Sequence, residues 1–219
     1  ALPAVVTISL AMGVRRIVKR NALIRRLPAV ETLGSTSVIC SDKTGTLTRN
    51  EMTVRKVIAA GASASLSGSG YDPEGEVLVE DVAVAAPQLV ADLLRTAALA
   101  CDATLDHDGD GQWAIRGDPT EGALVVAAAK LGMDKHELEA RYPRTDELPF
   151  SSERKRMTTL HDDGGSVFAC SKGAAEVIVE SSTTISSENG SVPLDDATRQ
   201  CILGPAESLA GEGLRVLGM

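Results

Sequence analysis

The stretch VICSDKTGTLT at residues 38–48 decides the fold. Val38 and Ile39 predict the end of a buried parallel strand, because a short, apolar, β-branched run is followed at once by turn-prone residues. Open α/β sheets bind their ligands beyond the carboxyl ends of their strands. We therefore expect Asp42 at the ligand-binding edge of an α/β domain.

The residues after Asp42 suit a phosphate ligand. Gly45 lets the backbone bend, and the hydroxyl groups of Thr44, Thr46 and Thr48 with nearby N–H groups can meet phosphoryl oxygens. A carboxylate attacks a phosphoryl group only when the charge of the target is neutralised, so the chemistry also needs Mg²⁺ and a cation such as Lys43 or another lysine nearby. The expected product is an aspartyl phosphate. The alternative is a strand that ends in a Ser/Thr/Gly turn with an incidental Asp.

Residues 41–48, SDKTGTLT, and the RNEMT that follows resemble the phosphorylation signature of the P-type cation-transporting ATPases. The resemblance implies that Asp42, Lys43 and Thr44 are catalytic, that Thr46 binds phosphate, and that Asp42 and Thr44 hold Mg²⁺. The implied fold class is α/β (α+β). It consists of the start of a haloacid-dehalogenase-like phosphorylation domain, followed by an inserted nucleotide-binding domain with an antiparallel sheet flanked by helices.

Charge is distributed unevenly along the 219 residues, of which 43% are apolar and 2% aromatic. The net charge is −8, which disfavours nucleic acid as a partner. The basic residues concentrate in the first quarter of the chain, and six of them follow the apolar residues 1–14: Arg15, Arg16, Lys19, Arg20, Arg25 and Arg26. This order is typical of the cytoplasmic end of a membrane helix.

Residues 1–14, ALPAVVTISLAMGV, reach only about 21 Å of a hydrocarbon core of about 30 Å, so they cannot span a bilayer alone. A buried helix of a soluble domain is the alternative. The stretch resembles the cytoplasmic half of the fourth transmembrane helix of the pumps. A helical pattern continues over residues 15–33, interrupted at Pro28, and corresponds to the stalk of the family.

These features divide the chain into four expected parts. They are a partial transmembrane helix at 1–14, a stalk helix at 15–33, the N-terminal part of the phosphorylation domain at 34–56, and a nucleotide-binding domain at 57–219 whose C-terminal part is incomplete. The last boundary lies just before the Gly/Ser-rich residues 61–76. The resemblance implies a multi-pass protein of the cell membrane with residues 15–219 on the cytoplasmic side.

The sequence GDPTEGALVVAAA at residues 117–129 predicts a helix that starts near Pro119 with Asp118 as its N-cap. Thr120 and Glu121 could serve only to cap this helix. The stretch also resembles the nucleotide-domain motif of the pumps, in which the matching Glu faces the adenine amino group. The resemblance therefore implies that Glu121 contacts the nucleotide.

Three further positions match nucleotide contacts of the family. Phe150 lies in a strand expected over residues 147–157 and would stack on adenine, although a core position in that strand is the alternative. Lys172 and Gly173 match the Lys-Gly-Ala motif of the pocket. Arg215 would reach the ATP phosphates from a strand at 214–217, and an exposed edge-strand arginine is the alternative.

The sequence departs from the animal muscle calcium pumps at Ser152, where those pumps carry Arg two residues after the stacking Phe. This difference leaves one triphosphate contact in doubt. Arg154, Lys155 or Arg156 could supply the charge instead, or could form a solvated strand edge.

The remaining patterns predict ordinary structural elements. The Asp-rich run at 106–110 predicts a hairpin turn and not a calcium loop, because Gly117 stands where such a loop needs Glu. Cysteines without CxxC spacing predict free thiols, and three isolated histidines, His107, His136 and His161, are expected at the surface. We further expect a strand at 52–60, helices at 87–101, 134–142, 175–180 and 195–210, the last interrupted near Pro205, and a surface loop at 181–193 with a turn at 189–190.

We therefore expect the ATP-binding and phosphorylation segment of an ATP-driven cation pump, with ATP and the transported cation as partners. Later family motifs, including the Gly-Asp-Gly-Xaa-Asn-Asp magnesium loop, do not occur in these residues, so the isolated chain should be inactive. One alternative is a soluble haloacid-dehalogenase-type phosphohydrolase, but Thr44 replaces the second Asp that such enzymes carry. The other alternative is a nucleotide-binding module without catalysis.

Overall fold

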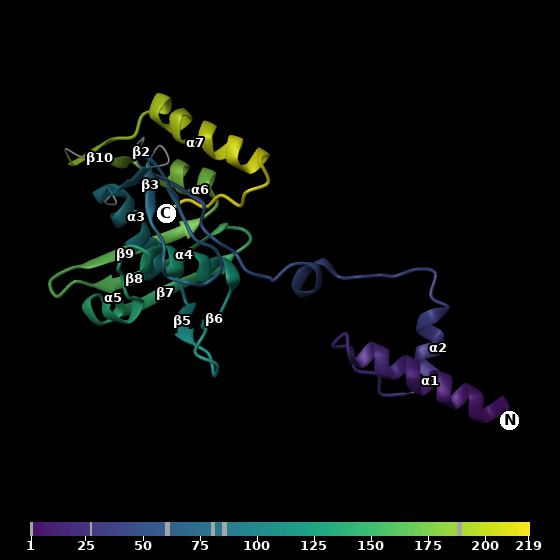
Figure 1. Cartoon of the computed structure of the whole chain (residues 1–219). Helices are drawn as coiled ribbons and strands as arrows, with labels where there is room; N and C mark the ends of the chain where they lie inside the picture. Colours follow the sequence, from purple (N-terminus) through teal and green to yellow (C-terminus); the bar gives the residue numbers. More distant parts are fainter. Residues whose placement is uncertain (1, 27, 60–61, 80–81, 85–86, 188–189) are drawn as a thin grey trace. The chain divides into compact units, whose positions relative to one another are not determined.

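The computed structural model describes residues 2–26, 28–59, 62–79, 82–84, 87–187 and 190–219 (Figure 1). The chain forms two compact units, Ala1–Arg49 and Asn50–Met219. The first holds the Asp42 stretch, and the second holds the remaining predicted site residues.

Among its described residues the first unit contains two α-helices, α1 (Leu2–Val18) and α2 (Pro28–Gly34), and one further helical turn at Lys43–Leu47. The helical pattern predicted over 15–33, with an interruption at Pro28, is present only in part, because residues 19–26 are not helical. The first helix ends at Val18, and Asn21 adopts a left-handed conformation with φ 60° that a helix cannot contain. Pro28 begins the second helix, where its missing N–H costs no hydrogen bond. No helix among the described residues is long and apolar enough to cross a bilayer.

The predicted strand ending at Val38 and Ile39 is absent. Both residues are exposed, at 71% and 86%, and the described part of the first unit contains no strand that could pair with them. An apolar run becomes a buried strand only where neighbouring strands satisfy its backbone groups. The local pattern therefore could not produce the strand by itself.

The second unit is built from antiparallel strands (Figure 1). One sheet is a meander of four strands: β1 (Lys56–Ala59), β2 (Ala62–Leu66), β3 (Val77–Val79) and β4 (Val82–Val84). A second sheet has three strands: β7 (Arg144–Ser151), β8 (Arg156–Asp162) and β9 (Val167–Gly173). Two hairpins complete the set: β5 (Thr104–His107) with β6 (Trp113–Arg116), and β10 (Thr184–Ser187) with β11 (Gly190–Pro193).

The described part of this unit also contains five helices: α3 (Gln88–Leu99), α4 (Pro119–Ala129), α5 (Lys135–Arg141), α6 (Ala175–Ser181) and α7 (Asp196–Gly211). Helix α3 is central, since it contacts β1, β9, α4 and α5. Its Val90 and Leu94 are buried in the core against the four-stranded sheet, and Leu99 packs with Cys170 of β9. The end of α3 therefore lies between two sheets.

This architecture confirms the predicted class of mixed α and β structure with antiparallel sheets flanked by helices. The predicted cap of α4 is also present, since the Asp118 carboxylate accepts hydrogen bonds from the Thr120 and Glu121 amides. The Asp134 carboxylate caps α5 in the same way by accepting from the Glu137 amide. The Asp-rich run leads into the turn of the β5–β6 hairpin, as expected: Asp106 and His107 end β5, and residues 108–110 lie in the turn.

Five predicted elements differ from the structure. Residues 147–157 form parts of two strands joined by a turn in which Lys155 has φ 48°. Residues 181–193 contain the β10–β11 hairpin; the turn predicted there includes Asn189, which lies outside the described residues. Helix α7 continues through Pro205. Residues 214–217 form no strand, and a single bridge joins Gly218 to Gly173. The strand expected over 52–60 begins only at Lys56, and residue 60 is also not described.

His161 is buried, so the prediction of a surface position is wrong. Alternate residues of β8 face the core, and His161 follows Met157 and Thr159 on that face. Its ring nitrogens lie 3.0 Å from the Tyr142 carbonyl and 2.8 Å from the Thr159 hydroxyl, so its polar atoms are satisfied. The four cysteines are free thiols, as predicted.

Candidate functional site

A backbone segment at residues 99–103, where α3 ends, organises the candidate site. The last carbonyl groups of a helix lack partners within the helix and carry partial negative charge. Here the side chains of Lys135, Arg144 and Lys172 donate hydrogen bonds to carbonyl groups of this segment. Two amides of the segment point instead to Glu121. The segment therefore joins cationic and anionic side chains from four different elements.

Glu121 stands in the first turn of α4, where Asp118 caps the helix. Its Oε2 accepts hydrogen bonds from the amides of Asp102 at 2.7 Å and Ala103 at 2.9 Å. Its Oε1 lies 2.6 Å from Lys172 Nζ. Both carboxylate oxygens are thus engaged, which fixes the orientation of the side chain.

Lys172 reaches the same place from β9. Its Nζ donates to the Ala100 carbonyl at 2.6 Å as well as to Glu121. The two side chains of this ion pair are only 11% and 16% exposed, so the pair is largely removed from water. The buried thiol of Cys101 lies 3.4 Å from Nζ, and burial raises its pKa to about 11 even though Lys172 opposes the shift. Cys101 is therefore neutral beside the pair at physiological pH.

Phe150 lies in β7 and is 62% exposed. The pairing of β7 with β8 is irregular between Leu148 and Ser151, and Phe150 lies in this interval. Strand β8 begins opposite this interval, and its second residue, Met157, pairs with Lys172 of β9. The sheet thus carries an exposed aromatic ring and the candidate lysine on outer strands, with β8 between them.

Arg215 lies beside the N-terminus of α4, where its Nη1 donates to Thr120 Oγ1 at 2.8 Å. Burial alone would raise the pKa of Asp118 there, but the pKa is lowered because amide hydrogen bonds from Thr120 and Glu121 and the charge of Arg215 outweigh burial. The structure thus brings Arg215 close to the helix turn that carries Glu121, although no strand positions it.

Gly173 has a clear packing reason to be glycine. A Cβ atom at this position would lie 2.4 Å from the Lys155 carbonyl, in the turn between β7 and β8. Both of its backbone groups bond to Gly218. The structure thus accounts for this glycine without a ligand, and its contact with nucleotide stays a prediction.

The Asp42 loop lies in the first unit, and its side chains are exposed. Asp42 Oδ1 accepts a hydrogen bond of 3.4 Å from the Thr44 amide, and the Thr48 amide closes the turn Lys43–Leu47 by bonding to the Lys43 carbonyl. Thr44 (φ −80°, ψ 123°) and Gly45 (φ 73°, ψ 1°) have the angles of a type II turn, which requires a residue such as glycine at the second position. Within the described part of the chain, this 3.4 Å hydrogen bond is the one contact that holds the Asp42 carboxylate.

A magnesium ion fits the oxygen donors of this loop in part. The Asp42 carboxylate and the Thr44 carbonyl supply two hard oxygen ligands, and Mg²⁺ is usually bound through one or two carboxylates, waters and substrate phosphates. Among the residues that the structure describes, no group of three acidic, His or Cys side chains could enclose a metal. The loop therefore suits a magnesium ion whose remaining ligands come from substrate phosphate and water.

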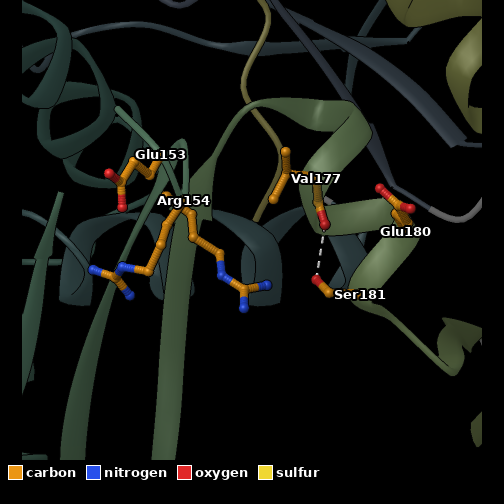
Figure 2. Close-up of a pocket in the computed structure, with 6 residues that line it drawn as sticks. Glu153, Arg154, Val177, Glu180 and Ser181 are labelled. Carbon is orange, nitrogen blue, oxygen red and sulfur yellow. Dashed lines mark hydrogen bonds between the residues drawn. The ribbon is translucent and has the colours of Figure 1, made fainter. Parts of the chain in front are cut away.

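Arg154 and Arg156, two of the residues considered as triphosphate contacts, line a separate groove of about 290 Å³. Figure 2 shows Glu153 and Arg154 on one side of this groove and Val177, Glu180 and Ser181 of α6 on the other. Glu121, Phe150 and Lys172 do not line it. The Arg154 guanidinium donates to the Pro149 carbonyl, which ties it to the chain beside Phe150.

Residues 89–219 match the family model described as "P-type ATPase, cytoplasmic domain N". The chain belongs to the P-type ATPases. It is 46% identical to the cation-transporting ATPase pma1 of Synechocystis over 224 residues, which cover 99% of the chain and 24% of that protein. It is 36% identical to a calcium-transporting ATPase of Bacillus subtilis over 100% of the chain and 25% of that protein, and 39% identical to the bovine calcium-transporting ATPase type 2C member 1 over 100% and 23%.

The resemblance drawn from the Asp42 stretch is thus confirmed at the level of the family. The chain spans about a quarter of the length of these relatives.

Sequence reasoning missed the backbone segment at residues 99–103 and two of the side chains that hold it, Lys135 and Arg144. A lysine in the first turn of a short helix looks like a solvated residue, yet Lys135 is 5% exposed.

Proposed function

We propose that Asn50–Met219 binds ATP, and that Asp42 accepts the γ-phosphate, within an ATP-driven pump for cations. The observation that carries this proposal is the ion pair between Glu121 and Lys172. Two residues 51 positions apart, each matched to a nucleotide contact by the resemblance, meet at 2.6 Å beside the end of α3.

The proposed pocket uses each of these groups in a chemically suitable way. Adenine stacks on the exposed ring of Phe150, which a flat apolar base partly covers. The Glu121 carboxylate accepts from the adenine amino group, and Lys172 lies at the base and ribose. Arg215, at the N-terminus of α4, meets the phosphates.

The transfer step assigns roles to the Asp42 loop. The Asp42 carboxylate attacks the γ-phosphorus, an Asp–phosphate bond forms, and ADP leaves. The backbone and hydroxyl groups of Thr44 and Thr46 bind phosphoryl oxygens, and Lys43 adds positive charge. A magnesium ion held by the Asp42 carboxylate and the Thr44 carbonyl would neutralise negative charge on the phosphate.

We propose the same four parts as from the sequence: a partial membrane helix at 1–14, a stalk at 15–33, the start of the phosphorylation domain at 34–56 and the nucleotide-binding domain at 57–219. The contacts place the division between the compact units at Arg49–Asn50. Val54, before the proposed boundary, already packs against the core of the second unit. The pump would lie in the cell membrane, with residues 15–219 on its cytoplasmic side.

The nature of the cation stays general in this proposal. Two of the relatives described above are called calcium-transporting and one cation-transporting. The described residues hold no cluster that could select a metal ion. We therefore assign the chain to cation transport and no further.

Replacing Phe150 by Ala should weaken ATP binding about tenfold or more, because base stacking on an aromatic side chain contributes about 1–3 kcal/mol. Titration calorimetry with ATP on the 219-residue chain measures the effect. Leu148→Ala is the matched control, since Leu148 lies on the same strand and is 47% exposed. Phe150→Trp should preserve binding. Equal affinities of Phe150→Ala and Leu148→Ala would remove Phe150 from the pocket.

A further inference from the structure

Two cations hold the backbone at residues 99–103 without touching Glu121 or Lys172 in any described contact. Lys135 Nζ donates to the carbonyls of Cys101 at 2.7 Å and Ala103 at 2.9 Å. Arg144 donates through Nη2 to the carbonyls of Leu99 at 3.3 Å and Cys101 at 2.8 Å. The Cys101 carbonyl thus accepts from both.

The same segment determines where Glu121 points. The amides of Asp102 and Ala103 bind its Oε2, which leaves Oε1 for Lys172. These amides lie directly beside the carbonyl groups that Lys135 and Arg144 hold. A shift of the segment would therefore move the carboxylate and change the ion pair.

Arg144 also fixes the Asp102 side chain, because its Nη1 lies 2.6 Å from Asp102 Oδ1 and 2.9 Å from Glu147 Oε2. Lys135 is 5% exposed and forms an ion pair of 3.2 Å with Glu139. Burying a charged lysine costs free energy, and an apolar side chain of the same size would often be as stable. Stability alone therefore gives no clear reason for a lysine at this position.

We propose that Lys135 and Arg144 are positioning residues of the nucleotide site, which act through the backbone at residues 99–103 on Glu121 and Lys172. The inference rests on the proposed ATP-binding function. Binding sites lose affinity when a contact group moves by about 0.5 Å, and the rigid attachment of this segment to α5 and β7 prevents such movement.

The test compares two lysines that both donate to backbone carbonyls. Lys135→Met should weaken ATP binding to the chain about five- to tenfold, the size of ordinary coupling between neighbouring groups. Lys130→Met is the matched control, since Lys130 Nζ donates to the Ser67 carbonyl outside the site. Its ATP affinity should stay unchanged. Equal losses in the two variants, or no loss in Lys135→Met, would overturn the proposal.

A double-mutant cycle separates positioning from a general loss of stability. In a Glu121→Gln background, Lys135→Met should weaken ATP binding less than about twofold, because the carboxylate that it positions is gone. In a Phe150→Ala background the full effect of Lys135→Met should remain. A loss of equal size in both backgrounds would contradict positioning through Glu121.

The amide proton resonances of Asp102 and Ala103 provide a readout without nucleotide. In Lys135→Met both should shift, because their hydrogen bonds to Glu121 change, whereas in Lys130→Met they should not. If the wild-type chain binds no ATP, the proposed function fails, and these resonances alone decide whether Lys135 positions Glu121.

If Lys135→Met does not fold, the same measurements are made on Arg144→Lys, which keeps the positive charge but loses the bidentate hydrogen bonding of the guanidinium. Unshifted resonances in the folded variant would overturn the inference.

Discussion

Replacing Asp42 by Asn in a full-length pump that carries this segment should reduce the phosphorylated intermediate by more than about 10³-fold, because a carboxamide has no anionic oxygen to attack phosphorus. The measurement is acid-stable, hydroxylamine-sensitive incorporation of ³²P from γ-labelled ATP. ATP binding should persist in the variant, since the proposed pocket lies in Asn50–Met219.

The control for this experiment is Asp110→Asn, an exposed carboxylate in the β5–β6 turn that should leave phosphorylation unchanged. Undiminished labelling of the Asp42→Asn variant would place the nucleophile elsewhere. A wild-type protein that binds ATP but forms no acyl phosphate would support the alternative of a nucleotide-binding module without catalysis.

Glu121→Ala should have the largest effect on stability of the changes considered, lowering the free energy of unfolding by about 2–4 kcal/mol. The change leaves the amides of Asp102 and Ala103 without an acceptor and removes the anion beside Lys172. Lys172→Met should cost less, because Glu121 then keeps both amide hydrogen bonds.

Urea-induced unfolding followed by circular dichroism measures both changes. Glu176→Ala serves as the control, since its pair with Lys155 spans 3.7 Å between side chains about 60% exposed. Such an exposed pair contributes about 0–1 kcal/mol. A Glu121→Ala variant as stable as Glu176→Ala would show that the described hydrogen bonds do not hold this site together.

The features that sequence reasoning predicted well are those that local chemistry determines. Asp118 caps α4 because its carboxylate reaches amides two and three residues ahead, and no distant group is needed. The apolar spacing of α3 likewise predicts its buried face.

Elements that depend on distant partners were predicted less well. Val38 and Ile39 have strand propensity, but without a neighbouring strand they are exposed. The β7–β8 hairpin was missed because its turn uses Lys155 with positive φ and contains no glycine signal. His161 was misplaced because its polar neighbours in sequence conceal the alternate burial of β8.

The candidate site shows the same division. The motifs identified Glu121, Phe150, Lys172 and Arg215 individually, but the separation of these residues along the chain does not give the distances between their side chains. The acceptors and donors that hold Glu121 and Lys172 are largely backbone groups at the end of α3, and a backbone group carries no signature in the sequence. This segment, with Lys135 and Arg144, could be found only from the structure.

The most direct test of the account is a titration of the 219-residue chain with ATP, followed through backbone amide resonances, in wild type and in Lys172→Ala. The account predicts saturable shifts centred on residues 102–103, Phe150 and Lys172, and an affinity at least about tenfold weaker in the variant. Shifts confined to the groove between Arg154 and Ser181, or an affinity that Lys172→Ala leaves unchanged, would contradict it.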